Sequence, residues 1–220
     1  MDQPISSRRR QLAAFIALAG GLAPALRAAA QNNPESGMRK VTGNVLVNGR
    51  PAAVGTPVRA GDTVVTGPGA VAMFAVGQDA FMMRAGSRAS FSGQDVALDA
   101  VRLLSGRLLS VFGKGGPRQL VTSTATVGIR GTGAYLESEA ERTYFCLCYG
   151  SAEVESMNGM ARDTYSTTHH ESPRYLYANR QERVMEAAGV INHTDAELIM
   201  LEALVDRTPP DAFMNSSPRY

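Results

Sequence analysis

Residues 96–121, VALDAVRLLSGRLLSVFGKGGPRQLV, contain the pattern that decides the fold. Short apolar runs alternate with polar residues, as in Val101-Arg102-Leu103, and alternation is typical of a half-buried strand because successive side chains point to opposite faces. Glycine-containing breakers separate the runs, and we expect turns at Ser105-Gly106 and at Lys114–Pro117. Gly113–Gly116 lacks the Lys-Ser/Thr of a phosphate-binding loop, so we interpret it as a hairpin turn.

The same pattern extends in both directions, from Val41 to about Val154. Further breakers include Asn48-Gly49 and Gly67-Pro68-Gly69, which tolerate the backbone angles of tight turns. Many short strands with regular turn signals predict an all-β domain, either a sandwich or a β-solenoid-like fold, and no strict repeat chooses between them.

The chain ends in the one helix that we predict with a clear pattern. Thr194 followed by Glu197 is a capping box, and the apolar residues after it fall on one helical face. A helix over about 195–206 is marginal alone, so it must dock. Docking on its own β domain would bring His193 towards the strand that carries the cysteines; docking on a partner is the alternative. The apolar face comprises Leu198, Leu201, Leu204 and Val205.

The N-terminus has the composition of an export signal. Arg8–Arg10 precede an apolar run, Leu12–Leu26, that is shorter than the roughly 20 residues of a membrane-spanning helix. Ala28–Ala30 then supply the small residues of a cleavage site. The Ser-Arg-Arg-x-x-Leu pattern from Ser7 resembles a twin-arginine signal. We therefore expect a periplasmic or secreted bacterial protein without a membrane-spanning segment in the mature chain.

Charge and composition exclude several classes of partner. The full chain has 22 basic and 20 acidic residues; without residues 1–30 these become 18 and 19, a net charge of −1. A nucleic-acid-binding protein needs a clustered basic face, so we expect no nucleic-acid partner. The mature chain of about 190 residues suits one domain with a small appendage.

Three blocks of sequence resemble the FecR domain family. They are Val41–Gly67, with VTGNVLVNG and GDTVVTG; Val121–Thr132, VTSTATVGIRGT; and Tyr149–Val154, YGSAEV. The resemblance covers roughly residues 41–156 and implies an all-β, solenoid-like fold and a link to regulators of iron-siderophore uptake. In those regulators a cytoplasmic anti-sigma segment and one membrane helix come first; here we expect a stand-alone form without the anti-sigma segment. A protein partner in the periplasm or cell envelope is the implied mode of action.

Four residues of these blocks are candidate structural or ligand-facing positions. Gly131 permits a bend, and Arg130 can pair with a carboxylate or with several carbonyl groups. Asp62, beside a glycine, is a turn former and a candidate partner for Arg130. Together with Thr132 these residues favour a structural role, and the alternative is that Arg130 faces an anionic ligand.

Both cysteines and all three histidines lie between residues 146 and 193. Cys146 and Cys148 are two apart in an apolar run that reads as a strand, so both sulfurs share one face and can reach one metal ion. His169, His170 and His193 could complete a zinc or copper site. A strained Cys146–Cys148 disulfide and two inert thiols are the alternatives, because the spacing matches no standard zinc motif.

No catalytic motif is present, so we expect a non-enzymatic protein. The leading hypothesis is a periplasmic binding or signalling module of the FecR type, with no certain cofactor. The alternative is a small metal-binding or redox protein that uses the Cys-x-Cys and histidine cluster. The predicted organisation is a signal peptide (1–30), a mobile leader (31–40), a FecR-type β domain (41–156), an irregular connector (157–190), a C-terminal helix (191–208) and a disordered tail (209–220).

Overall fold

The computed structural model describes residues 36–178 and 184–216. The expected signal peptide and the first part of the leader lie outside the described residues. In the described residues, one mixed sheet of fourteen strands is accompanied by two short helices, which confirms the predicted all-β class. The strands are β1 (Gly37–Thr42), β2 (Val45–Val47), β3 (Arg50–Pro51), β4 (Thr63–Thr66), β5 (Val71–Val76), β6 (Asp79–Met83), β7 (Arg88–Gln94), β8 (Ala97–Val111), β9 (Arg118–Val121), β10 (Ala125–Ser138), β11 (Arg142–Ser156), β12 (Arg162–Thr167), β13 (Arg174–Tyr177) and β14 (Met185–Ala187).

Three long strands divide the sheet into two layers that face each other. The first half of β8 pairs with β7 and β9, whereas its second half pairs with β6 and β10. In the same way β11 pairs with β13 near its start and with β12 near its end. We call the layer with β2, β3, β4, β7, β9 and β12 layer A, and the layer with β1, β5, β6, β13 and β14 layer B. Phe81 of layer B contacts Phe91 of layer A at 5.1 Å between ring centroids, so the space between the layers is the main core.

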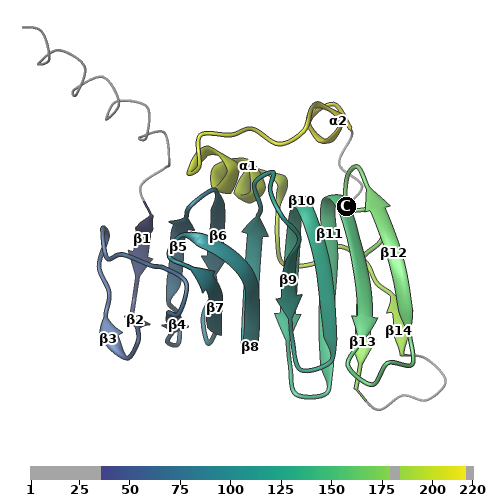
Figure 1. The fold of residues 1–220 in the computed structure, drawn as a ribbon, viewed down its shortest axis with the longest axis horizontal. Coiled ribbons are helices and arrows are strands. Elements are labelled where there is room, and N and C mark those ends of the chain that lie inside the picture. The colour runs from purple at the N-terminus through teal and green to yellow at the C-terminus, as the bar shows by residue number, and fades with distance from the viewer. Residues whose placement is uncertain (1–35, 179–183, 217–220) are drawn as a thin grey trace, which may run out of the picture. The chain divides into compact units, whose positions relative to one another are not determined.

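Along the long axis the strands follow one another in nearly the order of the chain (Figure 1). This succession resembles a solenoid more than a sandwich with long crossovers. It arises because most neighbours along the chain pair directly with each other.

Glycines with positive φ mark the points where the long strands pass between layers. They are Gly106 in β8 (φ +87°), Gly131 in β10 (φ +57°) and Gly150 in β11 (φ +99°). The predicted turn at Ser105-Gly106 is therefore wrong, since β8 continues through it as one bent strand. The predicted hairpin at Gly113–Gly116 is also wrong, because β8 and β9 pair in parallel and the loop between them is a crossover.

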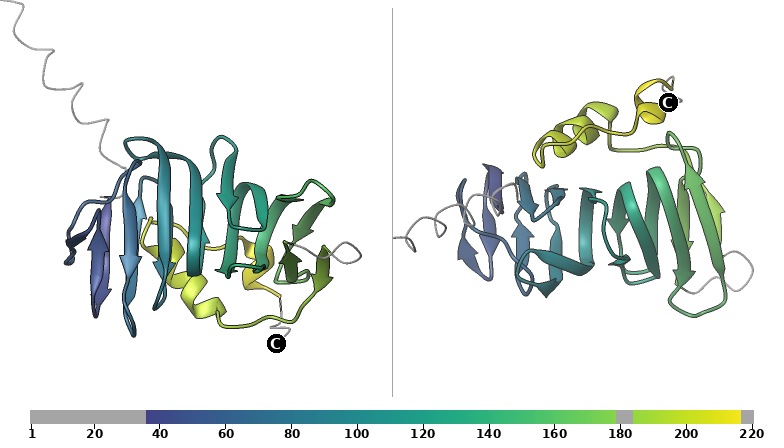
Figure 2. Two further views of the ribbon diagram at one scale, coloured as in Figure 1. Left: turned by 90° about the horizontal axis from the view of Figure 1, so that it is seen from below. Right: turned by 45° about the horizontal axis from the view of Figure 1, so that its top comes forward.

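Two helices cover the outer face of layer B (Figure 2): α1 (Asp195–Ala203) and α2 (Asp211–Met214). Strand alternation directs one set of layer B side chains inward and the next set towards these helices. A second core forms there from Leu198, Leu201, Val205 and Phe213 against the strand residues Met73, Ala75, Ala80, Met82, Leu109, Val111, Tyr135, Tyr144, Cys146, Cys148 and Tyr149.

Three expected segment descriptions need correction. Residues 157–190, expected to be an irregular connector, contain β12, β13 and β14. The tail expected to be disordered contains α2, whose Phe213 is buried in the second core. Strand β1 begins at Gly37, inside the expected leader, because it pairs with β5. Across residues 36–178 and 184–216, no helix is both long enough and apolar enough to cross a membrane.

Candidate metal centre

The two cysteines lie on β11 in layer B and face the helices. Leu147 between them points into the main core, so Cys146 and Cys148 share the opposite face, as the spacing predicts. Both are free thiols and both are fully buried. The outer position of β11 under α1 and α2 is what closes them off from solvent.

His170 comes from the loop after β12. The antiparallel pairing of β11 with β12 places Thr167 opposite Gly150, so the chain returns beside the cysteines. The His170 backbone N–H then donates to the Cys148 carbonyl oxygen at 3.0 Å. His170 has φ +57°, an uncommon conformation for a residue with a side chain, and it turns the imidazole towards the sulfurs.

His193 comes from the segment directly before α1. Its ring stacks on Tyr135 with centroids 4.5 Å apart. Thr194 is the N-cap of α1, and the predicted capping box with Glu197 is formed. The docked helix thus fixes the position of His193, because His193 directly precedes the N-cap residue Thr194.

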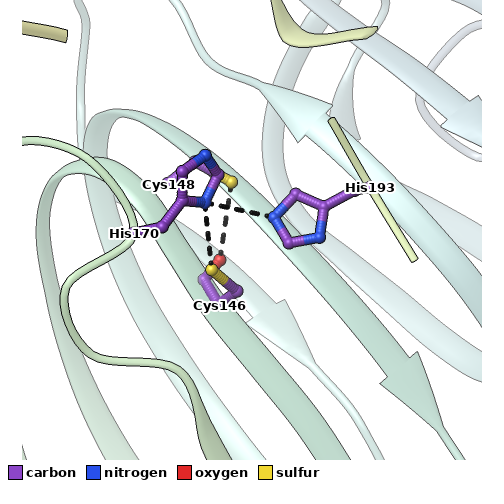
Figure 3. Close-up of side chains that lie close together, drawn as sticks. All are labelled: Cys146, Cys148, His170 and His193. Atoms are coloured by element: carbon purple, nitrogen blue, oxygen red, sulfur yellow. Dashed lines mark hydrogen bonds between the residues drawn. The ribbon is translucent and has the colours of Figure 1, made fainter. Parts of the chain in front are cut away.

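These four side chains converge on one buried point (Figure 3). Cys146 Sγ lies 3.3 Å from His170 Nδ1, and His193 Nε2 lies 3.2 Å from the same nitrogen. One ligand atom from each of Cys146, Cys148, His170 and His193 can be chosen so that all lie within 4.8 Å of one another.

Neighbouring acceptors fix which ring nitrogens carry protons. His193 Nδ1 donates to the Ile191 carbonyl oxygen at 2.6 Å, and a carbonyl can only accept. His170 Nε2 lies 3.2 Å from a carboxylate oxygen of Asp195, which likewise accepts. In the neutral rings, Nδ1 of His170 and Nε2 of His193 are then the lone-pair nitrogens; Nδ1 of His170 faces Cys146 Sγ, and Nε2 of His193 faces Nδ1 of His170. A carboxylate behind a ligating histidine is the usual second partner in metal sites.

The two thiols differ in their electrostatic surroundings. A hydrogen bond from the Cys148 side chain, joined by His170 and His193, holds the pKa of Cys146 well below its usual value although burial opposes this. Burial raises the pKa of Cys148, and the neighbouring Cys146 adds to the effect. Burial also disfavours the charged form of His170, but contacts with Cys146 and Asp195 outweigh it and raise its pKa.

Two of the donor–donor distances fit tetrahedral zinc. Zinc–nitrogen and zinc–sulfur bonds of about 2.0 and 2.3 Å give edges of about 3.3 Å between two nitrogens and about 3.5 Å between nitrogen and sulfur. The observed 3.2 Å between the imidazole nitrogens and 3.3 Å from Cys146 Sγ to His170 Nδ1 are near these values. Two thiolates and two imidazoles form a donor set typical of zinc.

A nucleophile triad is the competing interpretation of the same atoms. Cys146, His170 and Asp195 follow each other in hydrogen-bonding distance, as a nucleophile, its base and an orienting acid would. However, the Cys146 sulfur lies beneath the helices with no exposed surface, and a second cysteine and a second histidine occupy the same point. Four converging donors favour a closed metal site over a nucleophile that must meet a substrate.

The third histidine and one acid lie beside the four donors. His169 Nε2 is 3.0 Å from Asp195, so this expected ligand contacts the carboxylate instead of the sulfurs. With His170 and Asp195 it forms a second candidate group that shares one imidazole with the first. The sequence did not identify Asp195 as a candidate residue. Its position two residues after His193, in the first turn of the predicted capped helix, could have placed it beside the histidines.

Two of the family-like blocks, Val121–Thr132 and Tyr149–Val154, lie together where β10 pairs with β11, and Asp62 of the first block does not join them. Asp62 accepts hydrogen bonds from the Asn48 side chain at 2.7 Å and the Arg59 backbone at 2.8 Å, so the expected pairing with Arg130 is not formed. Arg130 is exposed, next to the bulge at Gly131 in β10. Thr132 is fully buried against Gly150, where an added Cβ would lie 2.6 Å from its methyl carbon.

Comparison with known proteins gives a distant structural likeness. No family model matches the chain, and no curated protein matches it. Two crystal structures of a candidate anti-sigma factor from Parabacteroides distasonis ATCC 8503 are similar, with TM-scores of 0.48 and sequence identities of 12% and 13%. Each match covers 57% of this chain and 59% of the other, so the likeness spans less than two thirds of that protein.

Proposed function

We propose that this chain is a non-catalytic module of the bacterial cell envelope that binds one Zn²⁺ ion through Cys146, Cys148, His170 and His193. The observation that carries the proposal is the convergence of four buried donor atoms within 4.8 Å of one another. Four protein ligands complete a tetrahedral shell and leave no position for a substrate, which is the arrangement of structural zinc sites.

Charge balance favours a divalent ion over Cu⁺. Two thiolates neutralise Zn²⁺, whereas Cu⁺ would leave the buried site with a net negative charge. Asp195 already places a carboxylate behind His170 and His169, which adds to the negative potential around the sulfurs. A divalent ion therefore suits this site better.

Metal analysis of the purified full chain tests the proposal. We expect one zinc per chain in the wild type and a loss of at least tenfold in affinity in Cys148→Ser, because serine removes one thiolate ligand. His169→Ala is the matched control: it removes a buried histidine next to the site but none of the four donors, so one zinc per chain should remain.

Two results would contradict the proposal. Absence of zinc from the wild type after incubation with one equivalent would refute it directly. Zinc that survives Cys148→Ser and disappears in His169→Ala would assign the ion to the group of His169, His170 and Asp195 instead.

The envelope location and the partner are supported by the sequence. The FecR-like blocks over 41–156 favour a module that acts through contact with another envelope protein, and Ser7–Leu12 favours export by the twin-arginine route. Substitution of Arg8 and Arg9 by lysine should keep the chain in the cytoplasm, as measured by cell fractionation. Unchanged export of this variant would exclude the twin-arginine route.

A further inference from the structure

We propose that zinc occupancy fastens the C-terminal segment, residues 188–216, to the outer face of layer B, so that loss of the ion releases this segment while the sheet stays folded. The inference rests on the proposed zinc site and adds a regulatory role to it.

The four ligands come from two parts of the chain that are attached to the sheet in different ways. Cys146 and Cys148 belong to β11, which is paired on both sides within the sheet, and His170 is bonded to the Cys148 backbone. His193 is the one ligand among the four that lies in the C-terminal segment. Coordination by all four therefore links the segment to the sheet, and three of the bonds end on the sheet side.

Without the metal link, the segment is held by side-chain packing and scattered hydrogen bonds, since its described residues contain no strand of the sheet. Helix α1 has nine residues, and a helix of this length is marginal unless it is packed against something. Its apolar anchors are Leu198, Leu201 and Val205, with Phe213 from α2. The polar anchors are Arg84 with Glu197 and with the Asn192 carbonyl oxygen at 2.8 Å each, Tyr144 Oη with the Gly189 carbonyl oxygen at 2.9 Å and with the Ile191 N–H at 3.3 Å, the Ala188 N–H with the Pro173 carbonyl oxygen at 2.9 Å, the Asn192 amide with Glu137 at 2.6 Å, the Tyr149 hydroxyl with Glu202, and Arg207 with the Gln78 carbonyl oxygen.

Asp195 transmits the state of the site to the helix. It lies in the first turn of α1, and its two oxygens contact His169 and His170. A metal-bound His170 holds its Nε2–H towards Asp195, so the ligand ring and the helix N-terminus are fixed together. When the ion leaves, His193 loses its bond to the sheet and His170 loses the bond that orients it.

The expected result of metal loss is a local opening. The main core between the layers contains none of the four ligands, because all of them lie on the helix side of layer B. Local unfolding with a free energy below the global value is expected for a segment that packs on one face of a sheet and contributes no strand to it. Removal of the ion then converts a closed face into an exposed apolar one.

Hydrogen exchange of the full chain tests this inference. With one equivalent of Zn²⁺ and then with excess EDTA, we expect at least tenfold faster exchange of the α1 amides 198–204 after chelation. The amides of β5 and β6 should exchange at the same rate in both states.

A substitution of one ligand isolates the link itself. His193→Phe keeps an aromatic ring on Tyr135 but cannot ligate, so added zinc should slow exchange in α1 much less than in the wild type, with the remaining effect passing through His170 and Asp195. Cys146, Cys148 and His170 remain in this variant, and it should still bind zinc with lower affinity.

The outcomes separate the two proposals. If the wild type binds no zinc, both the function and this inference fail. If it binds one zinc but chelation leaves α1 exchange unchanged, or accelerates the whole sheet equally, only this inference fails. It also fails alone if zinc slows α1 exchange in His193→Phe as much as in the wild type.

Discussion

Gly106 and Gly131 both have positive φ, but their surroundings differ. A Cβ at Gly106 would lie 2.5 Å from the Ser87 Cα, whereas at Gly131 it would meet nothing within 4 Å. Gly131→Ala should therefore cost only the backbone strain, about 1 kcal/mol. Gly106→Ala adds a backbone clash and should cost roughly 3 kcal/mol or more. Urea unfolding of both variants checks this, and equal losses would contradict the argument.

At the residue scale the turns predicted at Asn48-Gly49 and Gly67–Gly69 are formed, whereas one glycine predicted to be in a turn lies inside a strand. The bend at Gly131 was predicted from its missing Cβ and is a bulge in β10. The turn predicted at Ser105-Gly106 is not formed, because β8 continues through it. A glycine is needed both in a hairpin turn and where a strand passes from one layer to the other, so the local sequence does not distinguish the two. Local sequence shows that the backbone bends, but the pairing partners on either side decide whether the strand ends there.

Helix α1 separates buried from exposed positions clearly enough for a matched pair of substitutions. Leu201 is fully buried in the second core, and its neighbour Met200 is 45% exposed. Leu201→Asp places an unpaired carboxylate among apolar side chains, with an expected loss of about 3 kcal/mol. Because α1 belongs to the segment that opens without the sheet, this loss should accelerate exchange of the α1 amides at least tenfold and change the global Tm little.

Met200→Asp should leave α1 exchange within about twofold of the wild type, since exposed substitutions have small effects. Hydrogen exchange of the protein with one equivalent of Zn²⁺ measures both variants. Equal α1 exchange in Leu201→Asp and the wild type would show that Leu201 does not hold α1 to the sheet and would remove the physical basis for the position of His193.

At the element scale, helix α1 was predicted from the sequence and strand β12 was not. Thr194 and Glu197 form a local capping signal, and the apolar stripe required docking, so the approach of His193 to the cysteines followed from sequence. Strand β12 was missed because most of its side chains are exposed and polar; only Tyr165 and Thr167 alternate inward. An edge strand of this kind is recognised from its pairing with β11, and the local sequence carries no information about that pairing.

At the scale of the whole molecule, residues 36–178 and 184–216 form two apolar cores, which lie on opposite faces of layer B. Phe81 belongs to the core between the layers, where its ring lies 5.1–5.6 Å from those of Phe74, Phe91 and Phe112. Phe213 belongs to the core under the helices and contacts Tyr149 and His169. The sequence predicted apolar strands, but which face each residue occupies depends on layer pairing.

These two cores should respond differently to the same substitution. Phe81→Ala leaves a cavity between both layers and should lower the free energy of unfolding of the whole domain by about 3–5 kcal/mol. Phe213→Ala removes a ring of equal size from a segment that is attached at one face only. It should raise hydrogen exchange in α1 and α2 at least tenfold and shift the global unfolding midpoint much less than Phe81→Ala. Urea unfolding combined with hydrogen exchange checks both parts. If Phe213→Ala lowers the global midpoint as much as Phe81→Ala, the helices and the sheet unfold as one unit, and a C-terminal segment that opens by itself is excluded.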